Sequence, residues 1–188
     1  MRLVVGLGNP GKEYENTRHN VGYMFLDYVT KQAKFKVNRK FKAMEYETSM
    51  ADEHVMFIKP LTFMNLTGEA ILKYVNFYKI KPEAILIIQD DLDMPIGTFK
   101  LLFNHGDGGH NGIKNVVLNL GRRDFLRLKI GISKAAIDTK EYVLGSFTNE
   151  ENRVLREVFT KLDDFMQDYV MMNRDMLMGK YNSKEDNK

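Results

Sequence analysis

Residues 85–91 read I-L-I-I-Q-D-D, a short apolar run that ends in two carboxylates. Such a run is typical of a buried strand. A second apolar run, L-V-V-G-L-G at 3–8, opens the chain and is closed by glycines. Segments of helical periodicity separate such runs along the chain. The alternation predicts an α/β domain in which a sheet lies between layers of helices.

The segments around these two runs complete the expected fold. Asn20 can cap a helix whose apolar residues begin at Val21. Helices are predicted around residues 21–29, 70–78 and 112–120. Further strands are predicted at 44–50, 54–58, 97–103 and 127–132. The strands at 44–50 and 54–58 form a hairpin, so we expect a mixed, twisted sheet in a three-layer α/β/α arrangement.

The C-terminal third is predicted to serve packing. Apolar residues recur at helical spacing from Val154 to Val170 and form one long amphipathic stripe. The chain end, N-S-K-E-D-N-K, has nothing to bury and is expected to be disordered. We therefore expect a single catalytic domain over residues 1–179 and a disordered tail over 180–188.

Composition narrows the class of protein. A length of 188 residues suits one domain, and 44% hydrophobic content can supply its core. The absence of cysteine excludes disulfides, a thiolate nucleophile and cysteine-bound zinc. No signal peptide or membrane span is evident, which favours a cytoplasmic protein. The net charge of +3 permits a polyanionic partner without requiring one.

Asparagines near glycine recur at the predicted ends of elements. They are Asn9, Asn20, Asn65 and Asn111. Each alone is an ordinary turn or cap residue. Sites in α/β sheets form at the carboxyl ends of strands, and Asn9 and Asp90 both follow strands directly. Together these residues indicate a polar site at one edge of the sheet.

Several chemistries can be compared at this edge. G-L-G-N-P-G at 6–11 is a poor dinucleotide loop, because no helix opens directly behind the glycines to supply phosphate-binding N–H groups. D-D-L-D at 90–93 suits magnesium, although no second acidic cluster is evident. Alternatively, one of these carboxylates orients a histidine. No G-x-S-x-G motif is present, which disfavours a serine esterase.

His19 is the remaining candidate for chemistry. It lies just ahead of a predicted helix start, where the helix dipole favours a neutral imidazole. A carboxylate partner would favour the charged form and fix the tautomer. A histidine between these influences can accept a proton from water near neutral pH. Nearby amides could hold the water and stabilise an oxyanion. These residues point to a hydrolase that uses water directly, unless His19 is only a capping or solvent-facing residue.

Five motifs, taken in order, resemble the bacterial-type peptidyl-tRNA hydrolase family. They are G-L-G-N-P-G-K-E-Y-E-N-T-R-H-N-V-G at 6–22, P-L-T-F-M-N-L-T-G at 60–68, D-D-L-D at 90–93, G-G-H-N-G at 108–112 and R-L-K-I-G-I at 127–132. One such motif is weak evidence, but five with the family's order and spacing are very specific. The likeness extends from residue 2 to about residue 172.

The resemblance implies a monomeric, metal-independent enzyme that needs no cofactor. It cleaves the ester between an N-blocked peptide or amino acid and the 3′-terminal ribose of tRNA, and so recycles tRNA from aborted translation. It implies that His19 is the general base, that Asp90 stabilises its active form, and that Asn9 distinguishes N-blocked from free aminoacyl-tRNA. The residues implied to bind the acceptor end are Tyr14, Phe63, Asn65 and Asn111. Asn20 is interpreted as the helix cap.

The departures from the family lie in the acceptor-stem region. Many members carry a basic residue at the place of Leu102, and the place of Lys129 is often arginine. Lys100 and Lys129 are nevertheless expected to contact acceptor-stem phosphates. No obligate protein partner and no membrane are expected. Two other hypotheses remain at this stage: a metal-dependent phosphoesterase built on D-D-L-D, and an RNA-binding module without activity.

Overall fold

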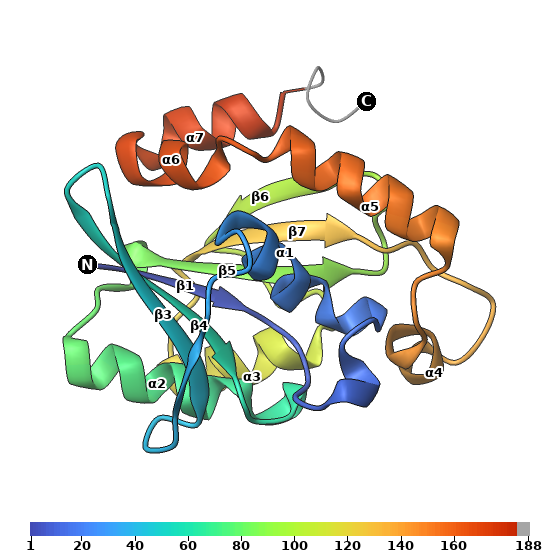
Figure 1. Cartoon of the computed structure of the whole chain (residues 1–188), viewed down its shortest axis with the longest axis horizontal. Coiled ribbons are helices and arrows are strands. Elements are labelled where there is room, and N and C mark those ends of the chain that lie inside the picture. Colours follow the sequence, from blue (N-terminus) through green and yellow to red (C-terminus); the bar gives the residue numbers. More distant parts are fainter. Residues whose placement is uncertain (184–188) are drawn as a thin grey trace.

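The computed structural model describes residues 1–183, in which seven strands form one mixed sheet flanked by helices (Figure 1). The strand order is β2-β3-β4-β1-β5-β7-β6. The strands are β1 (Arg2–Gly6), β2 (Lys36–Asn38), β3 (Ala43–Met50), β4 (Glu53–Pro60), β5 (Ile85–Asp91), β6 (Phe99–Phe103) and β7 (Leu126–Gly131). Strands β4, β1, β5 and β7 run parallel, while β2, β3 and β6 make the antiparallel pairings. The expected α/β/α architecture is confirmed.

Helices cover both faces of the sheet. One apolar core lies under α1 (Val21–Val29), α5 (Asn149–Lys161), α6 (Phe165–Met171) and α7 (Arg174–Tyr181). The other lies under α2 (Thr67–Tyr78) and α3 (Asn111–Leu120). A short helix, α4 (Thr139–Leu144), lies beyond the carboxyl edge of the sheet and carries two residues of the first core.

The alternation along β5 explains both cores and the polar end of the strand. Leu86 and Ile88 belong to the core under α1, whereas Ile85 and Ile87 belong to the core under α2. Because side chains of a strand alternate between faces, a strand covered on both sides must be apolar at every position. Asp90 continues this strand where the covering helices end, so its carboxylate reaches the edge where a site can form.

Gly22 explains how the first helix reaches this edge. A Cβ added to Gly22 would lie 2.5 Å from the backbone nitrogen of Leu7 and 2.6 Å from the carbonyl oxygen of Ile88. Only glycine allows α1 to begin this close to the ends of β1 and β5. The close approach carries His19, three residues earlier, over the carboxyl end of β5.

The C-terminal third carries the predicted amphipathic stripe on two helices, α5 and α6. The apolar stripe is divided, because the chain turns at Asp163 and Asp164 before Phe165 returns to full burial. The ordered domain also continues past residue 179: α7 runs to Tyr181, whose side chain is buried. The side-chain amide of Asn182 both accepts from and donates to the backbone of edge strand β6.

These contacts correct the expected domain boundary, because the amide of Asn182 satisfies backbone groups that β6 would otherwise expose. The remainder of the predicted tail, 184–188, lies outside the described residues. Strand β2 and helix α4 were not predicted, since neither has a distinct apolar pattern. Over residues 1–183, none of the helices is long and apolar enough to cross a membrane.

Candidate active site

A cleft of about 850 Å³ opens at the carboxyl edge of the sheet. Its walls come from the loops after β1, β4, β5, β6 and β7, together with α4 and the turn that precedes α1. The predicted site residues that line it are Asn9, Tyr14, His19, Phe63, Asn65, Asp90 and Asn111. The tertiary structure therefore brings together seven of the nine residues selected from the sequence, and only Lys100 and Lys129 lie outside its lining.

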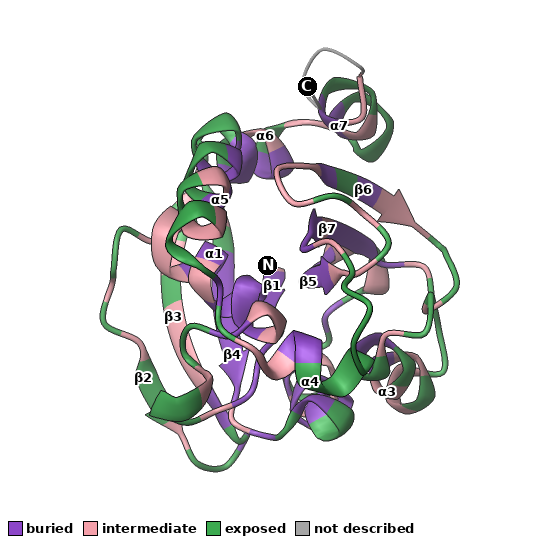
Figure 2. Ribbon diagram, turned by 90° about the vertical axis from the view of Figure 1, so that its right-hand side faces the viewer, coloured by how far each residue is buried: buried purple, intermediate pink, exposed green. Residues whose placement is uncertain are grey.

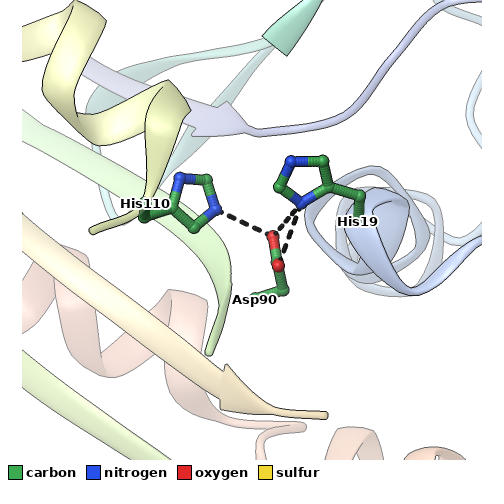
Figure 3. Close-up of side chains that lie close together, drawn as sticks. All are labelled: His19, Asp90 and His110. Atoms are coloured by element: carbon green, nitrogen blue, oxygen red, sulfur yellow. Dashed lines mark hydrogen bonds and ion pairs between the residues drawn. The ribbon is translucent and has the colours of Figure 1, made fainter. Parts of the chain in front are cut away.

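His19 is held by a carboxylate at the centre of this cleft. It lies in a 3-10 turn, Arg18–Asn20, directly before α1. Its Nδ1 lies 2.9 Å from each carboxylate oxygen of Asp90. Figure 3 shows the second ring nitrogen, Nε2, on the side of the ring away from Asp90. An Nδ1–H donor to Asp90 leaves Nε2 as the basic nitrogen of the neutral ring.

The environment of this pair sets its protonation. Burial lowers the pKa of His19, but the charge of Asp90 and its hydrogen bond outweigh burial and raise that pKa above its ordinary value. Burial acts to raise the pKa of Asp90, yet the imidazoles of His19 and His110 hold it well below its ordinary value. Asp90 is therefore a carboxylate throughout the neutral range, and it stabilises a proton on His19.

His110 is a second histidine on the same carboxylate, and sequence reasoning did not select it. Its Nε2 lies 2.8 Å from Oδ1 of Asp90. Its Nδ1 accepts hydrogen bonds from the backbone N–H groups of Gly112 at 3.1 Å and Ile113 at 3.3 Å, so the imidazole caps helix α3. Its place in G-G-H-N-G, before a predicted helix, was the available signal, but histidine is not among the usual N-caps.

The spacing of this cluster would also suit a metal ion. Donor atoms of His19, Asp90 and His110 all lie within 4.8 Å of one another. The cap on α3 argues against that use. Because backbone N–H groups only donate, Nδ1 of His110 must be unprotonated, and the proton of the neutral ring must be on Nε2. A metal ion at Nε2 would displace that proton and break the cap.

The remaining acids of D-D-L-D do not join the cluster. Asp91 forms an ion pair with Lys129, and Asp93 lies 3.9 Å from the ammonium of Lys134. Within residues 1–183, the only group of three or more potential metal ligands is the histidine–aspartate cluster. The three carboxylates of D-D-L-D therefore do not converge on one site in this structure. Asp90 instead orients a histidine.

A neutral part of the cleft is built on Asn9. Its backbone N–H donates to the side-chain oxygen of Asn20 at 2.8 Å, and its carbonyl accepts from the same amide at 2.9 Å. Its own side-chain oxygen accepts from the backbone N–H of Met64 at 2.8 Å. Since that oxygen is occupied, the amide of Asn9 is oriented, and its Nδ2 donors remain for a ligand.

The role expected of Asn20 is wrong. It occupies the N-cap position of α1, but its side chain makes no capping hydrogen bond. The two bonds to the backbone of Asn9 use the amide instead, and they join the loop after β1 to the turn that holds His19. Tertiary contact has overridden a local preference that was correctly identified.

Arg18 holds the turn that contains His19 against α4 and the start of α5. Its guanidinium donates to both carboxylate oxygens of Glu151, at 3.1 and 2.8 Å, and lies 4.3 Å from the ring centroid of Tyr142 on α4. Its backbone N–H donates to the carbonyl of Gly145 at 3.0 Å. Because both backbone and side chain are held, His19 follows a residue of fixed position.

Of the remaining predicted residues, two aromatic side chains lie at the rim of the cleft and two lysines lie outside it. Tyr14 and Phe63 form an edge-to-face ring pair with centroids 6.3 Å apart at the rim, and Phe63 is 52% exposed. Lys100 and Lys129 face each other across β6 and β7, outside the cleft lining. Lys100 is exposed, whereas Lys129 is paired with Asp91. Two lysines that were not predicted, Lys134 and Lys140, line the cleft itself.

A mixed α/β sheet with a buried aspartate, an oriented imidazole and fixed amides at its carboxyl edge is an arrangement that suits an acid–base enzyme. The family model described as peptidyl-tRNA hydrolase matches residues 3–188. A peptidyl-tRNA hydrolase of Desulfitobacterium hafniense is 47% identical over 163 residues, which cover 86% of this chain and 88% of that protein. A peptidyl-tRNA hydrolase of Clostridium botulinum is 39% identical, and the match covers 100% of this chain and 99% of that protein.

Solved structures agree with the sequence relatives. The crystal structure of peptidyl-tRNA hydrolase from Acinetobacter baumannii superimposes with a TM-score of 0.91 at 32% identity, covering 97% of this chain and 95% of that one. The chain belongs to the peptidyl-tRNA hydrolase family. The resemblance noted from five motifs is thereby confirmed over nearly the whole sequence.

Proposed function

We propose that the protein hydrolyses the ester between an N-blocked peptide or amino acid and the 3′-terminal ribose of tRNA, by water activated by His19. The observation that carries this mechanism is the double contact of His19 Nδ1 with Asp90 at 2.9 Å. It fixes the tautomer, so Nε2 can accept a proton from water as the water attacks the ester carbonyl. Asp90 then stabilises the imidazolium that forms.

The proton must afterwards reach the leaving group. Attack of water on the carbonyl forms a tetrahedral intermediate, and its collapse breaks the bond to the ribose oxygen. The imidazolium of His19 can return its proton to that oxygen, so the products are a carboxylic acid, which ionises, and a tRNA with a free ribose hydroxyl. Asn65 and Asn111 line the same cleft and supply amide donors for the substrate or the developing oxyanion.

Asn9 is proposed to recognise the blocked amine. With its oxygen committed to Met64, Asn9 presents N–H donors. These can donate to the amide carbonyl of an N-acylated substrate, whereas they repel the ammonium of a free aminoacyl ester. Leaving such a charge unpaired in a desolvated site costs several kcal/mol. The aromatic rim of Tyr14 and Phe63 offers rings on which the 3′-terminal base can stack.

The acceptor stem is proposed to lie against β6 and β7. Lys100 is exposed there, and Lys129 stands opposite it in the ladder. Lys129 must exchange Asp91 for a phosphate, so we expect Lys100 to contribute more to binding. Lys134 and Lys140 on the cleft wall are the candidates to replace the charge missing at Leu102. We further propose that the protein acts as a monomer in the cytoplasm, without an obligate protein partner.

The direct test is incubation of the purified protein with N-acetyl-aminoacyl-tRNA. Release of the N-acetyl-amino acid together with intact tRNA supports the proposal. Binding of tRNA without release would indicate an RNA-binding module. The reaction run in ¹⁸O-labelled water should place the label in the released carboxylate. Label-free product would indicate that water does not attack the carbonyl.

A further inference from the structure

Residues 31–42 read K-Q-A-K-F-K-V-N-R-K-F-K and carry an unusual share of the charge. The segment contains six basic side chains and no acidic one, in a chain whose overall excess is only +3. Its basic residues, called the basic edge below, are Lys31, Lys34, Lys36, Arg39, Lys40 and Lys42. The positive charge of the protein is therefore concentrated in this short segment.

The fold exposes all six of these side chains. They lie on β2 and its flanking loops, and β2 is the outermost strand of the sheet. Figure 2 shows β2 as exposed and on the opposite side of the molecule from β6 and α3. The basic edge is thus a surface separate from the lysines of β6 and β7, which lie at the other end of the strand order.

The segment is held in place although its charges face solvent. Phe41 is buried, and its ring packs edge-to-face on Tyr74 with centroids 4.7 Å apart. The side chain of Asn38 accepts from the backbone N–H of Phe41 at 3.0 Å. The carbonyl of Lys42 accepts from the N–H of Leu61 at 2.7 Å. A fixed arrangement of cations loses less entropy on binding than a flexible basic tail would.

Neighbouring acids do not neutralise the basic edge. Glu45 stands opposite Lys36 in the β2–β3 pairing, but its carboxylate accepts from the Tyr74 hydroxyl at 2.5 Å and from Asn38 at 2.9 Å. Glu47, the next acid on β3, lies 3.0 Å from His54. Within residues 1–183, no carboxylate forms an ion pair with any of the six cations.

An exposed ring accompanies these charges. Phe77, at the end of α2, is 59% exposed, and the ammonium of Lys40 lies 5.2 Å from its ring centroid. Lys73 donates to the carbonyl of Lys40 at 3.1 Å and adds a further cation. Cations that follow a backbone and a ring on which a base can stack are the usual elements of single-strand and loop RNA binding.

We propose that the basic edge is a second RNA-binding surface, which contacts substrate tRNA away from its 3′ end. Lys42 is bonded to Leu61, and the chain then runs directly to Phe63 and Met64 in the cleft wall. None of the six cations lines the cleft, so the surface is separate from the cleft but joined to its wall through Lys42, at the other end of the strand order from β6 and β7. The proposal rests on tRNA being the substrate. Its chemistry is phosphate neutralisation by lysine and arginine, with Phe77 available to an unpaired base.

The test compares two doubly substituted proteins that lose the same charge. Lys36→Gln/Lys40→Gln alters the basic edge, whereas Arg153→Gln/Arg156→Gln removes two exposed cations from α5. The probe is uncharged tRNA, which contains no ester to cleave, and its Kd is measured between about 50 and 200 mM salt. For the basic-edge variant we expect Kd to rise at least about threefold at low salt and the salt slope to fall by about 1.5.

The α5 variant should retain the Kd and salt slope of the wild type. A CCA trinucleotide, which represents the 3′ end alone, should bind all three proteins equally. The proposal is wrong if both double variants bind tRNA alike, or if the basic-edge variant loses trinucleotide binding in proportion. Anionic lipid vesicles provide a further arm. If binding to the vesicles is lost in the basic-edge variant while binding to tRNA is unchanged, the surface binds a membrane instead of RNA.

This outcome is separable from the proposed catalysis. Binding of uncharged tRNA needs no hydrolysis, whereas the catalytic proposal is tested with an N-acetylated substrate. If the basic-edge variant binds uncharged tRNA as tightly as the wild type while hydrolysis of the N-acetylated substrate proceeds, only the proposal of a second RNA-binding surface is wrong. Thermal unfolding of each double variant should match the wild type, because all four substituted side chains are exposed.

Discussion

The cleft has a charged part and a neutral part, and the two are built differently. In the charged part, His19 and His110 share the carboxylate of Asp90, so its properties depend on protonation. In the neutral part, Asn9 and Asn20 exchange backbone and side-chain hydrogen bonds, and nothing titrates there near neutral pH. The difference suggests a division of labour in which the first part moves protons and the second selects the substrate.

Removing the base tests this division most severely. His19→Ala should lower kcat by at least about 100-fold, since a general base contributes roughly 10² to 10⁴. The KM should change far less, and the protein should remain folded. His105→Ala, at an exposed histidine outside the cleft lining, is the matched control and should retain full activity. Equal activity of both variants would remove His19 from the mechanism.

Asp90→Asn should lower kcat as well, by a smaller factor, while tRNA binding stays nearly intact. It should also move the pH profile. In the wild type, kcat/KM should rise with pH through the raised pKa of His19, because only the neutral imidazole accepts a proton. An amide at 90 removes the charge that raises this pKa and leaves the burial that lowers it. The midpoint should therefore shift to lower pH.

Two companion variants make this measurement specific. Asp91→Asn and Asp93→Asn change carboxylates that pair with lysines away from the histidines. Both should retain the midpoint and most of the rate. A pH midpoint that is unchanged in Asp90→Asn would show that Asp90 does not control the protonation of His19.

In the neutral part, Asn9→Asp should change selectivity more than overall rate. A carboxylate cannot donate to the carbonyl of a blocked substrate, but it attracts a free ammonium. The ratio of kcat/KM for N-acetyl-aminoacyl-tRNA to that for aminoacyl-tRNA should fall by about tenfold or more, since a few kcal/mol separate the two substrates. An unchanged ratio would leave Asn9 with only a structural role. The pH midpoint should move less than in Asp90→Asn, because the hydrogen bonds of Asn9 go to Asn20 and Met64, whereas Asp90 is bonded to His19 itself.

The smallest expected effect is that of a chelator. Activity should survive excess chelator, because the α3 cap keeps the proton of the neutral His110 ring on Nε2 and disfavours a metal ion beside Asp90. Added magnesium should not raise the turnover of chelator-treated protein on a short N-acetylated CCA substrate. Loss of activity with chelator, restored by a specific metal, would mean that the histidine–aspartate cluster binds that metal during catalysis.

The basic edge and the lysines of β6 and β7 give a second contrast, at the two ends of the strand order. Lys129 is compensated by Asp91, whereas the basic edge has no ion-pair partner among residues 1–183. Compensated charge loses an existing interaction when it binds phosphate, so the uncompensated surface gains more per contact. Residues 31–42 belong to none of the five family motifs, and it is their uncompensated positive charge that suits them to bind phosphate.

The sequence by itself determined much of this protein. Apolar periodicity predicted the central strands and the first three helices, because a strand buried on both faces and an amphipathic helix each have a distinct pattern. Five ordered motifs predicted the family, and the end of the strand at Asp90 predicted the edge where the site lies. The pairing of His19 with Asp90 followed only from the resemblance to the family, because the residues by themselves indicate no more than that one carboxylate of D-D-L-D orients a histidine.

The tertiary structure decided the properties that depend on contacts between distant segments. It brought His110 within hydrogen-bond distance of Asp90 and the side-chain amide of Asn20 within hydrogen-bond distance of the Asn9 backbone. It formed the ion pair between Lys129 and Asp91. It also divided the C-terminal stripe between two helices, α5 and α6. Local patterns report a residue's preference for a helix, a cap or a solvent-facing position. They cannot report which partner a polar side chain meets, because that partner is supplied by packing across tens of residues, and a buried hydrogen bond outweighs a local capping preference.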